Sequence, residues 1–433
     1  MLSTALHYEA PWPVYALDWC RTSGPGQQRI RSGFRLALGS FTDDYRNRIS
    51  IVGLADESSL IDNGMDEQGY ADAYQGAPPQ SDFVVLAETM HGYPITKIAW
   101  EPASALSEGW RGPNFELLTS TGDALRIWEY GGEADVKPSS YVGRSQQAPY
   151  RLSQKIALSS AKNPTPTSAP LTSFSWNNMS PSLVVTSSID TTCTVWDISA
   201  NSAVTQLIAH DREVFDVAWV PGSIDSFVSV GADGSLRSFD LRSLEHSTIL
   251  YEAPSPKVPA NHTAATNQNS RPMTAPLLRI SFNPIDPNYI ATFHADSCDV
   301  QVLDMRIPGK PVSELKGHRA PVQAIGWGTS EGGTLASAGD DHQLLLWDLS
   351  PSAMSPRQQV RSPALSGSPH PESGQAVTRA VTEPIMAYTA PSEINNLTWS
   401  PHMSSMHLVN GEMTASGEWI AIANGRSVKV LKV

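Results

Sequence analysis

The chain has 433 residues, of which 40% are hydrophobic and 17% charged, and its net charge at pH 7 is −13. This acidic balance disfavours direct nucleic-acid binding, because phosphate contacts require clustered Lys and Arg, and it favours protein partners with basic segments. No apolar run approaches the roughly 18 residues of a membrane-spanning helix, and no secretory signal precedes Tyr8, so we expect neither a membrane span nor ordinary secretion.

One six-residue pattern recurs seven times along the chain. Each copy has an aliphatic residue, two variable residues, a second apolar residue, a small or polar residue, and then Trp or Phe. In chain order the copies are Val14–Trp19, Ile95–Trp100, Leu171–Trp176, Val214–Trp219, Leu277–Phe282, Val322–Trp327 and Ile394–Trp399. Such a repeat indicates stacked copies of one supersecondary unit.

Each copy predicts a β-strand. The fourth and sixth residues lie on one face of such a strand, and the fifth residue, which is mostly small, lies on the other. The segments are short, rich in β-branched and aromatic residues and bounded by turn residues, which favours strands over helices. A bulky face opposite a small one is typical of sheets that pack on neighbours from both sides.

Four segments between the copies are rich in Pro, Ser, Gly, Asn, Gln or acidic residues, and we expect disordered insertions there. They are residues 55–80, 131–169, 253–275 and 351–384. Without them the chain has about 44 residues per copy, which matches the roughly 40–45 residues of a four-stranded WD40 blade. The sequence therefore predicts an all-β fold, with residues 1–433 forming a single seven-bladed WD40 β-propeller.

The chain ends predict how this ring closes. After the seventh copy the last strand runs to Val433 and leaves its blade one outer strand short. The segments His7–Trp19 and Ala387–Trp399 match in register, with Tyr, Ala and Pro at equivalent positions. We therefore expect residues 4–10 to complete the last blade, which removes an exposed sheet edge.

Two sets of His, Ser, Asp and an aromatic residue invite a hydrolase interpretation. They are His318, Ser337, Asp341 and Trp347, and His210, Ser229, Asp233 and Phe239. A serine nucleophile requires an exposed elbow and an oxyanion hole, and no G-x-S-x-G motif occurs. We expect both sets to form buried hydrogen-bonded chains of WD40 blades instead, and the second to be one bond short because Phe239 has no indole N–H.

Two Asp-x-Arg boxes follow predicted third strands, Asp240 to Arg242 and Asp304 to Arg306. One interpretation is a surface ion pair that closes a turn, worth under about 1 kcal/mol. The other is a docking arginine for a partner ring. Other candidate contact residues lie in loops beside the repeat strands, where a rigid scaffold presents variable side chains: Asp211, Arg212, Glu213, Arg319 and His342.

The remaining motifs are weaker. Ser-Pro pairs at Ser355, Ser362 and Ser368 are candidate phosphorylation sites for a proline-directed kinase, although Ser and Pro are also common in disordered loops. The three cysteines have no metal-ligand spacing and are expected to be reduced and buried. Single histidines such as His91 show no ligand spacing, so we treat them as scattered and predict no metal or cofactor.

The chain resembles the TRANSPARENT TESTA GLABRA and anthocyanin-regulator WD40 family of plants, whose animal members are described as scaffolds for DYRK- and HIPK-type kinases. The phrases that carry the resemblance include SSIDTTCTVWDI (187–198), TQLIAHDREVFDVAW (205–219), DDHQLLLWDL (340–349) and EINNLTW (393–399). They are spread over nearly the whole ring. The four insertions depart from the compact pattern of that family, which indicates an elaborated, fungal member.

The resemblance implies a non-enzymatic platform that binds DYRK- or HIPK-like kinases or assembles transcription regulators. It also implies an alternative role as substrate receptor of a cullin-RING ubiquitin ligase, in which Arg242 and Arg306 would dock the linker subunit. A remote alternative is an enzyme with a site in the ring's channel, but the first-strand positions show no repeated Asp, Glu or His. We expect a monomeric ring, within larger complexes, in the cytoplasm and the nucleus.

Overall fold

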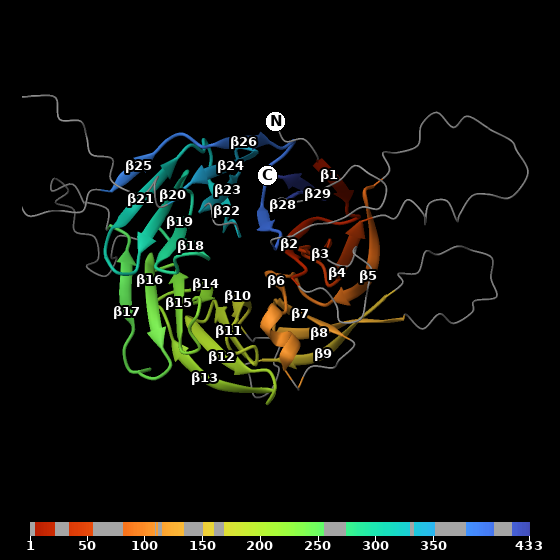
Figure 1. Cartoon of the computed structure of the whole chain (residues 1–433). Helices are drawn as coiled ribbons and strands as arrows, with labels where there is room; N and C mark the ends of the chain where they lie inside the picture. The colour runs from red at the N-terminus through yellow and green to blue at the C-terminus, as the bar shows by residue number, and fades with distance from the viewer. Residues whose placement is uncertain are drawn as a thin grey trace, which may run out of the picture.

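The computed structural model describes residues 5–21, 34–54, 81–108, 110, 115–133, 150–159, 169–254, 274–329, 333–350, 378–401 and 418–433. These residues form seven sheets arranged in a ring (Figure 1), and the strands of each sheet pair antiparallel except for one added parallel edge strand. In every sheet the innermost strand ends at the final aromatic residue of one copy of the sequence repeat. The all-β, seven-bladed propeller that the sequence predicts is confirmed.

The blades follow one another in chain order. The first has β2 (Val14–Trp19), β3 (Arg35–Ser40), β4 (Asn47–Leu54) and β5 (Phe83–His91). The second has β6 (Lys97–Trp100), β7 (Glu116–Thr121), β8 (Leu125–Glu133) and β9 (Tyr150–Leu158), with a short 3-10 helix, η1 (Ala103–Ser107), after β6. The third has β10 (Leu171–Trp176), β11 (Leu183–Ser188), β12 (Thr192–Asp197) and β13 (Ser202–Ile208).

The fourth blade has β14 (Val214–Trp219), β15 (Ser226–Gly231), β16 (Ser235–Asp240) and β17 (Thr248–Glu252). The fifth has β18 (Leu277–Phe282), β19 (Tyr289–His294), β20 (Asp299–Asp304), β21 (Pro311–Lys316) and an added edge strand, β25 (Arg379–Val381). The sixth has β22 (Val322–Trp327), β23 (Thr334–Gly339), β24 (Gln343–Asp348) and β26 (Met386–Thr389). The seventh has β27 (Asn396–Trp399), β28 (Trp419–Asn424), β29 (Ser427–Lys432) and β1 (Ala5–Glu9).

The ring closes through its first strand. β1 pairs antiparallel with β29, with Ala5 opposite Leu431 and Glu9 opposite Ser427, and the two strands lie side by side in Figure 1. The ring of His7 also contacts the hydroxyl of Ser427 at 2.9 Å. The predicted completion of the last blade by residues 4–10 is confirmed, apart from Thr4, which lies outside the described residues.

The sixth residue of the repeat joins neighbouring blades. The indole N–H of Trp219 donates to the carbonyl oxygen of Ser175 in the preceding blade at 3.1 Å, and Trp327 donates to Ser281 in the same way at 3.1 Å. The acceptor in each case is the fifth residue of the previous copy. A small fifth residue therefore leaves room for the Trp of the next blade, which explains the alternation of bulky and small positions.

The expected boundaries of two insertions need correction. β9 lies inside the segment 131–169, and β25 lies inside the segment 351–384. The apolar alternation of β9 is interrupted because a bulge shifts its register opposite Ile127 and Trp128, and an outer strand exposes one of its faces to solvent. β25 has only three residues and pairs parallel with β21, so its sequence pattern is too short to recognise.

Two further expectations concern membrane spans and cysteines. Among the described residues, no helix is long and apolar enough to cross a bilayer. None of the three cysteines forms a disulfide with a described residue, and Cys20 and Cys193 are buried as expected. Cys298 is only partly buried, because it lies in the loop before β20 and not inside a strand.

Candidate functional site

The candidate residues lie at two opposite ends of the ring. Strands within a blade are antiparallel, so the turn between the second and third strands and the turn after the third strand lie at opposite ends. We call the end with the second-to-third-strand turns, which carries His210, Asp233, His318 and Asp341, the His face. The opposite end, which carries Arg242 and Arg306, is the Arg face.

The structure brings His318, Ser337, Asp341 and Trp347 together in the sixth blade. The Trp347 indole N–H donates to the Ser337 hydroxyl oxygen at 2.9 Å, and that hydroxyl donates to Nε2 of His318 at 2.7 Å. Nδ1 of His318 then donates to the carboxylate of Asp341 at 3.0 Å. Because the indole is only a donor and the carboxylate only an acceptor, the Nδ1–H tautomer of His318 orders the hydrogen bonds in one direction from Trp347 to Asp341.

This arrangement is structural. Ser337 is fully buried and its lone pairs and proton are engaged within the chain of bonds, so the hydroxyl is not available to attack a substrate. Burial alone would raise the pKa of Asp341, but hydrogen bonds from the Arg319 backbone and His318 outweigh it and lower the pKa. The carboxylate therefore stays ionised and anchors the loop that begins at His318.

The fourth blade repeats the arrangement with one change. His210 contacts the Ser229 hydroxyl at 2.7 Å and the Asp233 carboxylate at 3.0 Å. Phe239 occupies the position of the indole and stacks on Phe227, with ring centroids 5.1 Å apart. Burial would raise the pKa of Asp233, but hydrogen bonding to His210 lowers it well below its ordinary value.

A third network in the second blade was missed from the sequence. His91 contacts the Ser120 hydroxyl at 3.2 Å, and the Trp128 indole donates to that hydroxyl at 2.8 Å. Nδ1 of His91 donates to the Tyr93 carbonyl oxygen at 2.6 Å in place of a turn carboxylate. The interpretation of His91 as a scattered residue is therefore wrong.

A spacing signal could have found this network. His91, His210 and His318 each precede the final aromatic residue of the next repeat by nine positions. The turn carboxylate, Asp123, lies one residue early and pairs with Arg126, and the spacing from Ser120 to Trp128 is shorter, which hides the rest of the set. Burial is the main cause that lowers the pKa of His91, to about 4, so this histidine is neutral at physiological pH.

The Arg face carries both Asp-x-Arg boxes, in neighbouring blades. Arg242 donates through Nε and Nη2 to the two carboxylate oxygens of Asp240 at 2.9 and 2.6 Å. Arg306 makes the same bidentate pair with Asp304 at 2.8 and 2.7 Å. The hydrogen bond from the Arg242 side chain is the main cause that lowers the pKa of Asp240, to about 2.

Each arginine also lies near a second acidic residue. Asp225 is 3.9 Å from Arg242, and Asp286 is 3.8 Å from Arg306. The Arg306 guanidinium lies over the ring of Tyr289, 5.3 Å from its centroid. Both arginines nevertheless remain accessible, with 71% and 53% of their side chains exposed. They are oriented by their carboxylates and still present free edges to solvent.

Four neighbouring blades share the Asp of this turn, but only two have the Arg. In the third and sixth blades the carboxylates of Asp197 and Asp348 accept the backbone N–H of Ser199 and Ser350, both at 2.9 Å. Asp240 accepts the backbone N–H of Arg242 at the same distance. The Asp therefore closes the turn in each blade, and the Arg is an addition that the turn does not require.

The other predicted contact residues lie on the His face, in two clusters on the fourth and sixth blades. Asp211 and Arg319 follow the network histidines, and their backbone N–H groups donate to Asp233 and Asp341 at 3.2 and 2.9 Å. The Asp211 carboxylate accepts a hydrogen bond from Arg237. Arg212 pairs with Glu213 at 3.5 Å. His342 lies in the turn after Asp341 with a φ of 64°.

Ser355, Ser362 and Ser368 lie outside the described residues, so their candidate phosphorylation stays a prediction.

An aromatic cluster on the His face was also missed. Tyr45 and Tyr93 pack edge to face with centroids 6.2 Å apart, and Tyr45 and Phe41 are 79% and 44% exposed. In the sequence, the cluster is indicated by Phe41 and Tyr45, which lie close together in a short acidic turn.

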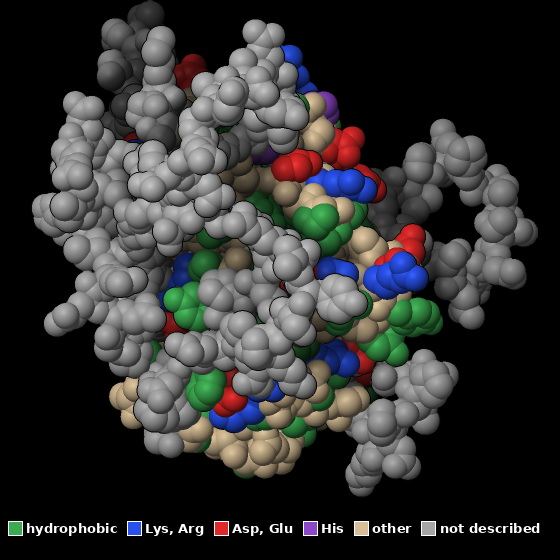
Figure 2. All heavy atoms as spheres, turned by 90° about the vertical axis from the view of Figure 1, so that its right-hand side faces the viewer, with side chains coloured by type: hydrophobic (Ala, Val, Ile, Leu, Met, Phe, Trp, Pro, Cys, Tyr) green, Lys and Arg blue, Asp and Glu red, His purple; other side chains and the backbone are tan. Residues whose placement is uncertain are grey.

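The outer side of the ring has a mixed surface. On the side that Figure 2 shows, acidic, basic and apolar side chains lie interspersed. Ion pairs join neighbouring outer strands within each of the first two blades. Arg48 pairs with Glu88 in the first blade, and Lys155 pairs with Glu129 in the second. Within the described ranges no group of three or more His, Cys, Asp or Glu side chains could hold a metal ion.

Comparisons with known proteins place the chain in a family. The model of the WD domain, G-beta repeat, matches residues 309–348. The chain is 36% identical to the DDB1- and CUL4-associated factor 7 homolog of Dictyostelium discoideum over 98% of both chains. It is 36% identical to an uncharacterized WD repeat-containing protein of Schizosaccharomyces pombe, over 98% of this chain and 89% of that protein.

A WD repeat-containing protein of Saccharomyces cerevisiae is 32% identical over 100% of this chain and 77% of its own length. These alignments span all seven blades and are not confined to one repeat. The chain therefore belongs to the WD40-repeat family that includes the DDB1- and CUL4-associated factor 7 homolog.

Proposed function

We propose that the protein is a non-enzymatic adaptor that holds other proteins on the two faces of its ring. Three features support this function. The only His–Ser–Asp sets among the described residues are buried in structural networks, the loops on the His face expose charged and aromatic side chains, and the Arg face presents a pair of oriented arginines. A rigid scaffold with variable loops is a common way to build an interaction surface.

The Arg face is the proposed docking site for a ubiquitin-ligase linker subunit. The observation that carries it is the Arg at the turn of the fourth and fifth blades, where the third and sixth blades have Ser. A bidentate carboxylate fixes each guanidinium, so less side-chain entropy is lost when a partner binds. The Dictyostelium relative is named for association with DDB1 and CUL4, which indicates a partner of that kind.

The His face is the proposed site for clients. Because it lies at the opposite end of the ring from the Arg face, a client and a ligase subunit could occupy the protein together. DYRK- or HIPK-like kinases and transcription regulators are the proposed clients, in the cytoplasm and the nucleus, on the basis of the family resemblance. In this arrangement Asp211, Arg319 and the aromatic residues Tyr45 and Tyr93 contribute to the client surface.

The test exploits the natural Ser turns. Arg242→Ser and Arg306→Ser together give the fourth and fifth blades the turn of the third and sixth blades, so the fold is retained. The affinity-tagged full-length double variant, expressed in cells, should lose about tenfold or more of its co-purifying DDB1 and CUL4. The matched control is Asp211→Ala with Arg319→Ala on the His face, which should keep both subunits.

The experiments test the docking site on the Arg face and the adaptor function separately. Undiminished DDB1 with the double Ser variant would remove the Arg face as the docking site but leave the adaptor function. For the clients, quantitative proteomics should show kinases or transcription regulators that depend on the His face and not on the Arg face. Absence of any stoichiometric protein partner on the wild-type chain would contradict the adaptor function itself.

A further inference from the structure

The central channel contains a cavity of about 200 Å³ that all seven blades line. Each blade contributes the third residue of its sequence repeat. These residues are Ala16, Lys97, Ser173, Asp216, Arg279, Ala324 and Asn396. Bulges explain this regularity, because five of the innermost strands shift register between the first and third repeat residues. The third position thereby becomes a ring of channel-facing side chains.

The charges of the lining do not balance locally. It has three cations and two carboxylates, and both carboxylates already have an ion-pair partner. Asp18 lies 3.5 Å from Arg21, and Asp216 lies 3.4 Å from Lys97. Arg279 is left as the lining cation with no carboxylate within 4.0 Å in the described part of the chain.

Four donors hold the Asp216 carboxylate in place. In addition to Lys97, it accepts hydrogen bonds from the Ser173 hydroxyl and from the backbone N–H groups of Val217 and Ile280, the last two at 2.9 Å. Its side chain is only 3% exposed. Three of these donors contact Oδ1 and one contacts Oδ2, so the carboxylate is fixed where it lies and makes no ion pair with Arg279 within 4.0 Å.

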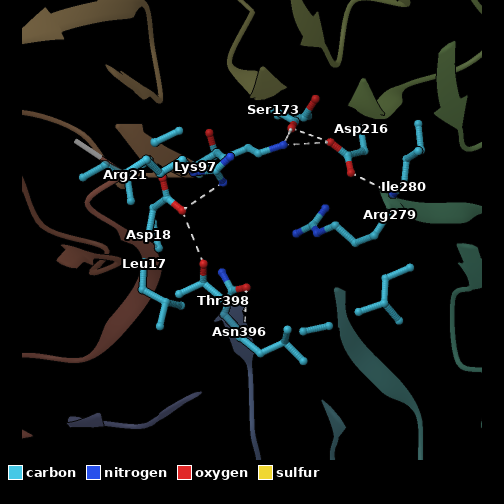
Figure 3. Close-up of a pocket in the computed structure, with 18 residues that line it drawn as sticks. Leu17, Asp18, Arg21, Lys97, Ser173, Asp216, Arg279, Ile280, Asn396 and Thr398 are labelled. Carbon is cyan, nitrogen blue, oxygen red and sulfur yellow. Dashed lines mark hydrogen bonds and ion pairs between the residues drawn. The ribbon is translucent and has the colours of Figure 1, made fainter. Parts of the chain in front are cut away.

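Arg279 itself donates to two neutral acceptors. Nη2 donates to the Tyr15 hydroxyl oxygen at 2.7 Å, and Nη1 donates to the Leu278 carbonyl oxygen at 3.1 Å. Because Tyr15 belongs to the first blade and Arg279 to the fifth, the first bond crosses the channel. Figure 3 shows the guanidinium extending into the cavity, with the Lys97 ammonium, Ser173 and Asp216 to one side of it. Its remaining N–H groups form an oriented donor edge.

Burial disfavours the charge of Arg279, but interactions with Tyr15 and Asp216 outweigh it and raise the pKa of this guanidinium above its ordinary value. Arg279 is therefore a cation at every physiological pH. Arg279 is partly buried and has no ion-pair partner within 4.0 Å among the described residues, and its planar fork matches the oxygens of a carboxylate or phosphate.

We propose that the channel of this protein binds a small oxyanion, a phosphate or carboxylate group, at the donor edge of Arg279, with Lys97 as a second cation of the same cavity. The cavity is smaller than the roughly 300–1,000 Å³ of pockets for drug-sized ligands, which limits the ligand to an inorganic anion or a small metabolite. The site is independent of both proposed docking faces.

The overall charge of −13 does not contradict this site. Exposed charges are screened over about 8 Å at physiological ionic strength, so acidic residues on the outer surface contribute little in the channel. The local field there comes from the lining residues, whose formal charges sum to a positive value.

The test is calorimetric titration of the full-length protein with inorganic phosphate and, separately, acetate, at an ionic strength held constant with NaCl. Wild type should show saturable binding of at least one of the two, and the responding anion identifies the ligand class. Arg279→Met should weaken it by about tenfold or more, because a charge-assisted bidentate contact is lost. Arg151→Met removes an exposed arginine of the outer strand β9 and should leave the binding unchanged.

Circular dichroism shows whether Arg279→Met keeps the ring. If it does not, Arg279→Lys carries the test, since it keeps the charge, loses the fork, and should bind phosphate several-fold more weakly. The proposal is overturned if wild type shows no saturable binding of either anion, or if the Arg279 variants bind as wild type does. It is also overturned if only a bulky polyanion such as inositol hexakisphosphate binds, because the cavity cannot contain it.

Discussion

The indole N–H of Trp19 donates to the carbonyl oxygen of Thr398 at 3.2 Å, although the two residues are 379 positions apart. The same bond joins Trp399 to Gly326 at 2.8 Å in the preceding pair of blades. Trp19 thus makes between the last and first blades the contact that other repeat tryptophans make between consecutive blades. The closure of the ring is one more copy of the repeat interface, and it brings the chain ends together.

This closure depends on β1. Deletion of residues 1–10 should lower the free energy of unfolding by about 3 kcal/mol or more, because burial of Tyr8 alone is worth roughly 1.5–3 kcal/mol and the edge of β29 becomes unpaired. Chemical denaturation of the purified chain measures the change. Deletion of residues 1–4 is the matched control, since β1 begins at Ala5. Equal stability of the two deletions would contradict the role of β1.

The small fifth residue of the repeat is tested at Gly326. A Cβ at this position would lie 2.8 Å from Cδ1 of Leu397 and 3.2 Å from Cδ1 of Trp399. Gly326→Ala should therefore destabilise the ring by about 1–3 kcal/mol through overpacking. Gly92→Ala is the control, because its Cβ would meet no atom within 4 Å. A thermal melt in which both variants match wild type would show that the neighbouring Trp does not require the small residue.

In the buried network of the sixth blade, loss of the terminal hydrogen bond from Trp347 should cost less free energy of unfolding than loss of the central Ser337 hydroxyl. Trp347→Phe reproduces the natural composition of the fourth blade and should cost about 1 kcal/mol, the value of one hydrogen bond. Ser337→Ala leaves both His318 and Trp347 without a partner and should cost about 2–4 kcal/mol. Urea denaturation ranks the two variants. The reverse order would contradict the central position of Ser337 between His318 and Trp347.

His91 predicts a pH dependence. Its folded pKa is about 4 and its ordinary value is 6.5, so the unfolded chain binds the proton more tightly. Stability should therefore fall as pH decreases from 6.5 to 4, by at most about 3 kcal/mol, and this contribution is fully present above pH 6.5.

The measurement is Tm against pH for wild type and His91→Gln. The slope between pH 6.5 and 4 should be smaller in the variant, which has no titrating group at this position. The exposed His246 provides the control, since His246→Gln should keep the wild-type slope. An unchanged slope in His91→Gln would show that His91 is protonated in the folded ring.

The Arg face also gives a prediction about thermal stability. Arg242→Ser with Arg306→Ser should leave Tm unchanged, because the turn N–H groups still donate to Asp240 and Asp304 and exposed ion pairs contribute little. Differential scanning calorimetry checks this before any binding experiment. A clear drop in Tm would indicate that the arginines are structural and would favour the ion-pair interpretation of the boxes.

Several features could be read from the sequence because they are periodic. The strand pattern, the spacing of the copies and the match of His7–Trp19 with Ala387–Trp399 predicted seven blades and the closing strand. β9 was placed in an insertion because a bulge interrupts its alternation. The His91 network was missed because a backbone carbonyl oxygen of Tyr93 replaces the expected Asp.

The sequence by itself determined the number and kind of blades, since strand period and repeat length are properties of short, contiguous segments. Only the tertiary structure decided that Arg242 and His210 belong to opposite faces, and that Arg279 reaches Tyr15 across the channel without a carboxylate. The physical reason is that ring closure places side chains from distant blades around one axis. The charge balance there depends on this spatial arrangement and not on the order of residues along the chain.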